Sequence, residues 1–204
     1  MADVTLTYKG STIAEMNNSG TKTLKTAGKY CEGDIVVSYV KPEGGTSDEL
    51  AKKMITGEGN ITELPSDITT IRNGAFYNCT NLALTSLPSG ITKIDNYAFY
   101  CCTNIALTSL PEGIASIGYY AFYFCTNLAL TSLPSGITSI GDYAFSSCTS
   151  LTTLTFKGTP TSISSSAFKD CTNLTNIYVP WAEGAVSGAP WGATNATIHY
   201  NTTT

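Results

Sequence analysis

The 204-residue sequence has little charge, one histidine and no long apolar run. Charged residues make up only 13% of the chain, the net charge is −4, and lysine and arginine form no cluster. A nucleic-acid partner requires several phosphate-neutralising cations on one face, so nucleic acid is not an expected partner. No stretch approaches the roughly 20 apolar residues of a spanning helix, so membrane insertion is not expected either.

Catalytic motifs are also missing. The sequence contains no G-x-x-x-x-G-K, no G-x-G-x-x-G and no H-E-x-x-H, the patterns that hold phosphates, dinucleotides and catalytic zinc. The lone His199 lies in an alternating tail, and we interpret it as a surface or cap residue, since a catalytic pair would need it beside a nucleophile. Asp95, Asp142 and Asp170 fall in turns, where aspartate is routine. We therefore predict a non-enzymatic protein with no catalytic residue, metal site or cofactor.

The seven cysteines follow a regular spacing rather than a disulfide pattern. Their odd number, in a chain whose start shows no secretory signal, argues against a disulfide framework. Zinc would need four ligands at paired short spacings. Five of the cysteines are instead 23 residues apart: Cys79, Cys102, Cys125, Cys148 and Cys171. We predict that these five pack as small hydrophobes and that Cys101, outside this register, is partly exposed.

A 23-residue repeat explains this spacing. Ala-Phe pairs recur with the same period, as Ala75-Phe76, Ala98-Phe99, Ala121-Phe122, Ala144-Phe145 and Ala167-Phe168. Leu-Pro recurs in step with them, and the unit reads C-T-N-L-A-L-T-S-L-P-S-G-I-T-x-I-x-x-Y-A-F-x-x. A fixed period through five copies indicates a solenoid in which each coil must stack on its neighbours to bury its apolar face.

The unit predicts a mainly β coil with a short 3-10 or helical corner. Leu82, Leu84 and Leu87 suit a short strand that faces the core and ends at Pro88. Ser-Gly then supplies a turn, two isoleucines begin the return path, and the Ala-Phe pair forms a compact corner with the phenylalanine inside. Strands stacked about 4.8 Å apart would give six coils a ladder roughly 29 Å long, with one face of parallel strands.

The strings L-P-S-G-I-T-S-I-G-D-Y-A-F-S-S-C-T-S-L and A-F-K-D-C-T-N-L-T-N-I-Y-V-P resemble the BspA-like class of leucine-rich repeat. The resemblance implies a right-handed leucine-rich repeat solenoid and a role in adhesion at a cell surface. Repeats two to four depart from the family by carrying L-A-L-T-S-L where it usually has L-x-x-I-x-I/L. Residues 4–40 and the segment after Pro180 are similar to flanking segments of prophage tail-associated proteins, which implies a virion as an alternative destination.

Four segments are expected along the chain. Residues 1–41 form a small β module, which at this size should pair with a second copy, the solenoid or a larger assembly. Residues 42–57 are a linker with a short capping helix, Glu49 to Ile55, opened by a capping box. Residues 58–180 form the solenoid, and residues 181–204 form a C-terminal cap that uses Trp191, Ile198 and Tyr200.

Two surfaces are candidates for binding. Tyrosines flank the Ala-Phe corners, and the predicted contacts among them are Tyr97, Tyr100, Tyr119, Tyr120, Tyr123 and Tyr143. Such rings suit protein or sugar contact, although stacking along the ladder to seal the coils is the alternative interpretation. The strand face otherwise carries small, threonine-rich side chains, and Lys157 and Tyr178 are larger. The C-terminal end of this face is therefore the second candidate.

The expected function is presentation of the repeat surface to a protein or a surface glycan. The alternative is a structural spacer or accessory protein of a phage-tail-like particle, with residues 1–41 docked into the particle. As written, the sequence predicts a cytoplasmic start, and the resemblances imply release to a cell surface or a virion.

Overall fold

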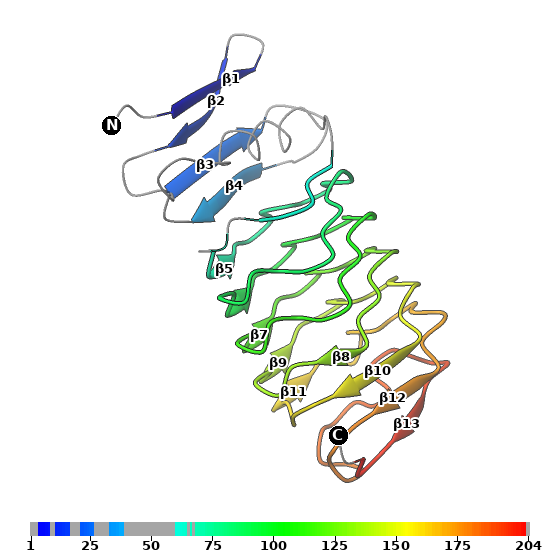
Figure 1. Cartoon of the computed structure of the whole chain (residues 1–204). Coiled ribbons are helices and arrows are strands. Elements are labelled where there is room, and N and C mark those ends of the chain that lie inside the picture. Colours follow the sequence, from blue (N-terminus) through cyan, green and yellow to red (C-terminus); the bar gives the residue numbers. More distant parts are fainter. Residues whose placement is uncertain are drawn as a thin grey trace.

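The computed structural model describes residues 4–8, 11–16, 21–26, 33–38, 60–64, 66 and 68–202. From residue 60 onward these form a β-solenoid of stacked coils (Figure 1). The expected linker and the capping helix, Glu49 to Ile55, lie outside the described residues, as does Cys31.

The strands near the N-terminus form a separate antiparallel sheet. Its members are β1 (Val4–Tyr8), β2 (Ser11–Met16), β3 (Thr21–Thr26) and β4 (Gly33–Ser38), each paired with the next along the chain. The β1–β2 register shifts between Leu6 and Thr7. Strands β1 and β4 overlap the sequence runs 4–8 and 34–40, whose residue types favour strands, whereas β2 and β3 come from residues to which we assigned no strand.

One side of the solenoid is a ladder of five short parallel strands. They are β5 (Thr70–Ile71), β6 (Lys93–Ile94), β7 (Ser116–Ile117), β9 (Ser139–Ile140) and β11 (Ser162–Ile163), paired in chain order. Each strand is only two residues long, and its isoleucine points into the core. The ladder runs along one side of the stacked coils (Figure 1), on the return path that follows turns such as Ser89-Gly90 and Ser135-Gly136.

The second ladder lies on the leucine side of the coils and is confined to the C-terminal half. It consists of β8 (Ser132–Leu133), β10 (Thr153–Phe156), β12 (Asn176–Tyr178) and β13 (Thr197–His199), in the order β13-β12-β10-β8. The expectation of a single strand face was therefore wrong, because the C-terminal coils have paired strands on two sides. In the first coils the leucine run makes one isolated bridge, between Ile61 and Leu82.

The leucine spacing explains where this second ladder is regular. Leu82 and Leu84 alternate at the start of their run, and a three-residue step to Leu87 then breaks the period of two. In the fifth run the step comes first, so Leu154 and Phe156 alternate at the end and both are buried along β10. The departure from the family pattern thus accompanies a shorter strand, since the L-A-L-T-S-L run at 128–133 contributes only the two-residue β8, whereas β10 has four residues.

Columns of identical side chains fill the core. The five Ala-Phe phenylalanines are buried and stack face to face, with ring centroids 5.0–5.4 Å apart. Beside them, buried cysteine thiols donate hydrogen bonds to phenylalanine carbonyls of the preceding coil, for example from Cys148 Sγ to Phe122 O at 3.0 Å. The prediction that the register cysteines pack as core residues is confirmed, since all five are buried thiols.

The corners around the Ala-Phe pairs are turns without a helix among the described residues. Alternate N–H groups close 3-10-type turns within the corner, as from Ala75 to the Arg72 carbonyl. The intervening N–H groups bond to the next coil, as from Phe76 to the Ala98 carbonyl at 2.8 Å. Because every second donor is committed to the neighbouring coil, the turns cannot propagate into a helix.

A tryptophan-rich segment covers the last coil. Trp191 is fully buried, and its Nε1 donates to the Ser187 carbonyl at 2.8 Å. Its ring contacts Phe156 and Trp181, with centroids 6.0 and 6.2 Å away. Strand β13 then pairs with β12 and brings Ile198 against the core, so the segment forms the last rung of the ladder as well as its cover.

Candidate binding surface

Five of the predicted tyrosines, together with Tyr77, form two parallel stacked columns on the outside of the corners, and the predicted Tyr119 lies outside both. One column follows the buried phenylalanines and contains Tyr77, Tyr100 and Tyr123, with centroid separations of 4.5 and 4.9 Å. The other precedes the Ala-Phe pairs. It contains Tyr97, Tyr120 and Tyr143, with separations of 5.3 and 4.9 Å.

Tilted contacts join the two columns into one aromatic surface, the closest being Tyr120 to Tyr123 at 5.4 Å. The interpretation that these rings stack to seal successive coils describes the columns well. All six rings are half-buried, and most of their faces are covered by a neighbour in the same column. The columns therefore present mainly ring edges and hydroxyl groups to solvent.

The corner backbone explains why the flanking rings turn outward. The alanine and phenylalanine of each pair are buried, so the residues on either side leave the core. Tyr97, Tyr120 and Tyr143, immediately before the alanine, have a left-handed φ of 54°. This conformation is uncommon for a bulky L-residue, and here it is held by hydrogen bonds to the neighbouring coil, such as Tyr120 N–H to the Asp142 carbonyl at 2.8 Å.

Two phenols of this surface hold their protons more tightly than an ordinary tyrosine, because their pKa values are raised. Burial, followed by the neighbouring Cys101, Tyr77 and Tyr123, raises the pKa of Tyr100 to about 12. The pKa of Tyr120 is also raised, first by burial and then by nearby ionisable groups that include Asp142. Cys101 is partly exposed, as predicted, and burial raises its pKa as well. A neutral hydroxyl-edged surface can donate and accept hydrogen bonds but offers no activated nucleophile.

The corner at residues 118–125, called here the third corner, differs from the others in exposing two large rings. Tyr119 is 41% exposed and Phe124 is 45% exposed. Together with Tyr120 and Tyr123 they form a row that crosses both columns, in the order Phe124, Tyr123, Tyr120, Tyr119. Its successive centroid separations are 6.3, 5.4 and 6.2 Å.

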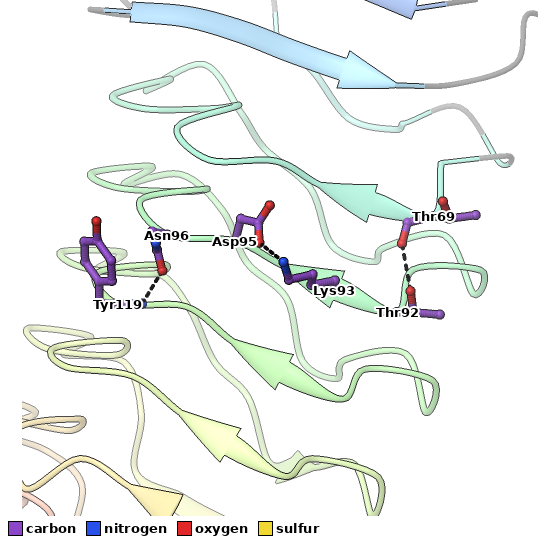
Figure 2. Close-up of polar contacts among 6 residues, drawn as sticks. All are labelled: Thr69, Thr92, Lys93, Asp95, Asn96 and Tyr119. Carbon is purple, nitrogen blue, oxygen red and sulfur yellow. Dashed lines mark hydrogen bonds and ion pairs between the residues drawn. The ribbon is translucent and has the colours of Figure 1, made fainter.

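Tyr119 is anchored to the coil before it. Its backbone N–H donates to Asn96 Oδ1 at 3.0 Å, which Figure 2 shows together with the Lys93–Asp95 ion pair on the same coil. The two coils approach closely at Gly118, where an added Cβ would lie 2.5 Å from the Asn96 backbone nitrogen. The Tyr119 backbone is thus fixed while its ring remains exposed.

The two candidates at the C-terminal end occupy different surroundings. Tyr178 lies on β12 and stacks on His199 of β13, with ring centroids 4.4 Å apart. His199 Nε2 in turn lies 2.9 Å from Asn176 Oδ1. Lys157 follows β10 and forms an ion pair with Glu112 at 2.7 Å. This pair is exposed and contributes little to stability, although its hydrogen bond lowers the pKa of Glu112.

Besides Tyr77, two residues of the aromatic surface are absent from the predicted contacts, Phe124 and Lys169. The Lys169 Nζ lies over the Tyr143 ring, 5.7 Å from its centroid. Comparison by register could have identified both. Phe124 occupies a position where the other corners carry small or polar residues, and Lys169 replaces a column tyrosine.

A scan against family models matches residues 57–180 to the BspA type leucine rich repeat region, in six copies. The chain belongs to the BspA-type leucine-rich repeat family. The predicted resemblance is confirmed for the repeat, and a surface-binding or adhesion module is consistent with this family. The proposed likeness of the flanks to prophage tail proteins stays a prediction.

Solved structures resemble this BspA-type repeat. The leucine-rich repeat protein of T. pallidum is 32% identical, with a TM-score of 0.57 and 72% of each chain covered. The pneumococcal vaccine antigen PcpA is 19% identical, with a TM-score of 0.52. There the match covers 71% of this chain and 42% of the antigen, and it supports the fold alone. A search of curated proteins gives no match.

Within the described residues, His, Cys, Asp and Glu side chains form no group of three or more able to hold a metal ion. Nor does any helix among them have the length and apolarity needed to cross a bilayer.

Proposed function

We propose that this BspA-type repeat is a non-enzymatic recognition module that binds a protein or glycan through the aromatic surface of its corners. The observation that carries the proposal is the third corner. Tyr119 and Phe124 are the exposed large apolar side chains of the described residues, and they flank the half-buried Tyr120 and Tyr123, which contact each other. Exposed aromatic groups of this kind mark interaction sites, and tyrosine is enriched among binding hot spots.

The rest of the surface supports this assignment by contrast. Over most coils the leucine-side strand face carries small alanine, threonine and serine side chains, which offer little relief for selection. The Tyr178–His199 stack and the Lys157–Glu112 ion pair provide local contacts at the other end. An amphipathic ring is better suited than a threonine hydroxyl to contribute large contact area at low entropic cost.

The test compares the full chain with a double variant, Tyr119→Asn plus Phe124→Asn, on glycan and protein arrays. These replacements are the residues found in register at Asn96 and Asn78, so the fold should be retained. We expect a ligand of the wild type to bind at least tenfold more weakly to the double variant, since two hot-spot side chains typically contribute more than 1 kcal/mol each. The matched control is Tyr178→Thr on β12. If wild type and double variant bind equally and the control variant loses binding, the site lies instead on the β13-β12-β10-β8 sheet.

A further inference from the structure

The third corner departs from its repeat twice. The position of Tyr119 is occupied in the other corners by Asn73, Asn96, Asp142 and Ser165. The position of Phe124 is occupied by Asn78, Cys101, Ser147 and Asp170. Phe124 also has a left-handed φ of 57°, a conformation that favours the asparagine found elsewhere. A large exposed ring in this backbone conformation is unfavourable for folding, which points to a role outside folding.

These two rings are also placed differently from the column rings. Both ring contacts of Tyr119 are edge-on, at interplanar angles of 84° to Tyr97 and 85° to Tyr120. The contact of Phe124 with Tyr123 is tilted, at 32° and 6.3 Å. Neither ring belongs to a stacked column in the described structure, so each is free to offer part of its face to a partner.

An exposed carboxylate lies beside this surface. Asp142 occupies the register position of Tyr119 in the next coil, and its backbone carbonyl accepts a hydrogen bond from Tyr120 N–H at 2.8 Å. Its Oδ1 accepts a hydrogen bond from the Ser164 hydroxyl. The carboxylate is close enough to contribute to the raised pKa of Tyr120. The third corner itself carries no positive side chain, so its rings face a partner next to a negative charge.

The molecule already shows how a ring of this surface receives a cation. At the C-terminal end of the second column, Lys169 Nζ lies 5.7 Å from the centroid of Tyr143, within the roughly 6 Å that defines a cation–π contact. That face is the one left uncovered where the column ends. The third corner offers uncovered ring face without a lysine of its own to fill it.

We infer that the third corner binds a basic protein surface, with an arginine or lysine side chain placed against Tyr119 and beside the Asp142 carboxylate. This inference rests on the proposed function and specifies its partner. Charge complementarity favours this occupant, because the chain has a net charge of −4. A second copy would bring the same negative charge, and a neutral glycan would leave the carboxylate without an opposite charge. Arginine suits the site better than lysine, since its planar guanidinium stacks on rings and pairs with carboxylates.

The test uses synthetic peptides that share one leucine-serine scaffold and carry two arginines, two lysines, two glutamines or two glutamates. Binding to the full chain is measured by fluorescence anisotropy. We expect the arginine peptide to bind at least tenfold more tightly than the glutamine peptide, with lysine between them, and affinity to fall as salt is raised. Tyr119→Asn plus Phe124→Asn and, separately, Asp142→Asn should each weaken the arginine peptide at least fivefold. Glu183→Gln, which neutralises an exposed carboxylate in the C-terminal cover, is the charge-matched control that should leave it unchanged.

Parallel measurements distinguish this inference from the function on which it rests. If a neutral oligosaccharide binds and the double variant abolishes that binding, with no arginine preference among the peptides, the recognition surface stands and the basic partner is wrong. Concentration-dependent self-association in sedimentation, lost in the double variant, would identify a second copy and also overturn the inference. If neither peptide nor sugar binding depends on the two rings, the proposed function fails with it.

Discussion

At the scale of single residues, the position two after each buried phenylalanine is left-handed in all five corners. Asn78, Cys101, Phe124, Ser147 and Asp170 occupy it, with φ between 56° and 60°. Asparagine and aspartate tolerate this conformation because their short polar side chains bond locally, whereas other L-residues are strained there. The corner geometry is thus imposed by the stack and not by local preference.

Replacement of Phe124 by asparagine should therefore stabilise the protein. We expect Phe124→Asn to raise the free energy of unfolding by about 1 kcal/mol, because the left-handed strain is relieved and an exposed ring is removed. Urea denaturation followed by circular dichroism measures the change. Phe124→Leu, which keeps an apolar side chain in the same backbone conformation, is the control without gain. An asparagine variant less stable than wild type would show that the ring contact with Tyr123 outweighs the strain.

Stability should also fall in alkali through the tyrosine columns. The folded pKa of Tyr100, about 12, lies above the ordinary value near 10. The folded state therefore retains a proton that the unfolded state loses between these pH values. The contribution of this group is complete below pH about 10 and is lost as the pH rises toward 12. Burial raises the pKa of the core cysteines in the same direction.

Urea unfolding at several pH values between about 9 and 11 measures this loss. Tyr100→Phe keeps the stacked ring without the hydroxyl, so its stability should decline less steeply with pH than that of the wild type. Parallel pH profiles for the two proteins would contradict a raised pKa at Tyr100.

At the scale of elements, the phenylalanine column couples each coil to the next. Phe122 lies between Phe99 and Phe145, with ring centroids 5.0 and 5.4 Å away, and it is fully buried. Its truncation removes contacts on both sides at once and leaves a cavity that fixed backbone hydrogen bonds prevent from collapsing. Truncation of a ring in this column should therefore lower the free energy of unfolding more than the loss of any single surface contact.

The variant Phe122→Ala should cost about 3–5 kcal/mol. Because a solenoid is held together by nearest-neighbour interfaces, the loss should also divide unfolding into separate transitions of the two halves. Phe122→Leu, which conserves most of the volume, should cost less than about 2 kcal/mol and remain cooperative. Chemical denaturation with hydrogen exchange resolved by coil distinguishes the two. Equal losses would mean that the ring stack contributes little beyond volume.

The sequence predicts the core columns well, because the 23-residue period determines which side chains lie above one another. The spacing of Phe99 and Cys102 by one repeat from their equivalents implies columns, and the structure has both. It predicts strand position less well, because Leu82, Leu84 and Leu87 mix steps of two and three. Hydrogen-bond pairing of the neighbouring coil then decides the outcome, and that pairing is not a local property.

The aromatic surface shows the same division. Positions that flank the buried Ala-Phe pair had to point outward, so the tyrosines could be placed from the sequence. Whether their rings stack on one another depends on side-chain torsions, and neighbouring coils set these torsions. The spacing of residues in the sequence does not determine them. Tyr120 stacks on Tyr143, whereas Tyr119 and Phe124 make only edge-on or tilted ring contacts. The placement of Lys157 beside Glu112, two coils away along the chain, likewise required the three-dimensional stack.

At the scale of the whole molecule, the repeated core and the variable surface run along the same axis. Identical phenylalanine and cysteine columns run through all the coils, while the differences between coils lie in the corners and at the C-terminal cover. Trp191 fills the end of the core and bonds to Ser187, so the last coil is protected from solvent. The repeat can thus vary its corners without disturbing its core, which is how one unit comes to expose rings that the others lack.

This separation predicts that a whole coil can be removed without loss of the fold. Deletion of residues 107–129 joins Ala106 to Leu130 and restores the string T-N-I-A-L-T-S-L-P-S-G. Phe99 then stacks on Phe145, and Tyr97 stacks on Tyr143. The chain should fold with a ladder shorter by about 4.8 Å, a smaller free energy of unfolding because one interface is lost, and no binding through the third corner.

Circular dichroism, small-angle scattering and the peptide assay measure these three outcomes. The control deletion, residues 107–117, removes about half a period and joins Ala106 to Gly118, so the inward positions of the remaining coils no longer match. It should not fold cooperatively. If the 23-residue deletion folds but still binds the arginine peptide as the wild type does, the columns of Tyr97, Tyr100 and Tyr143 are sufficient for recognition, and the two exposed rings of the third corner are not its centre.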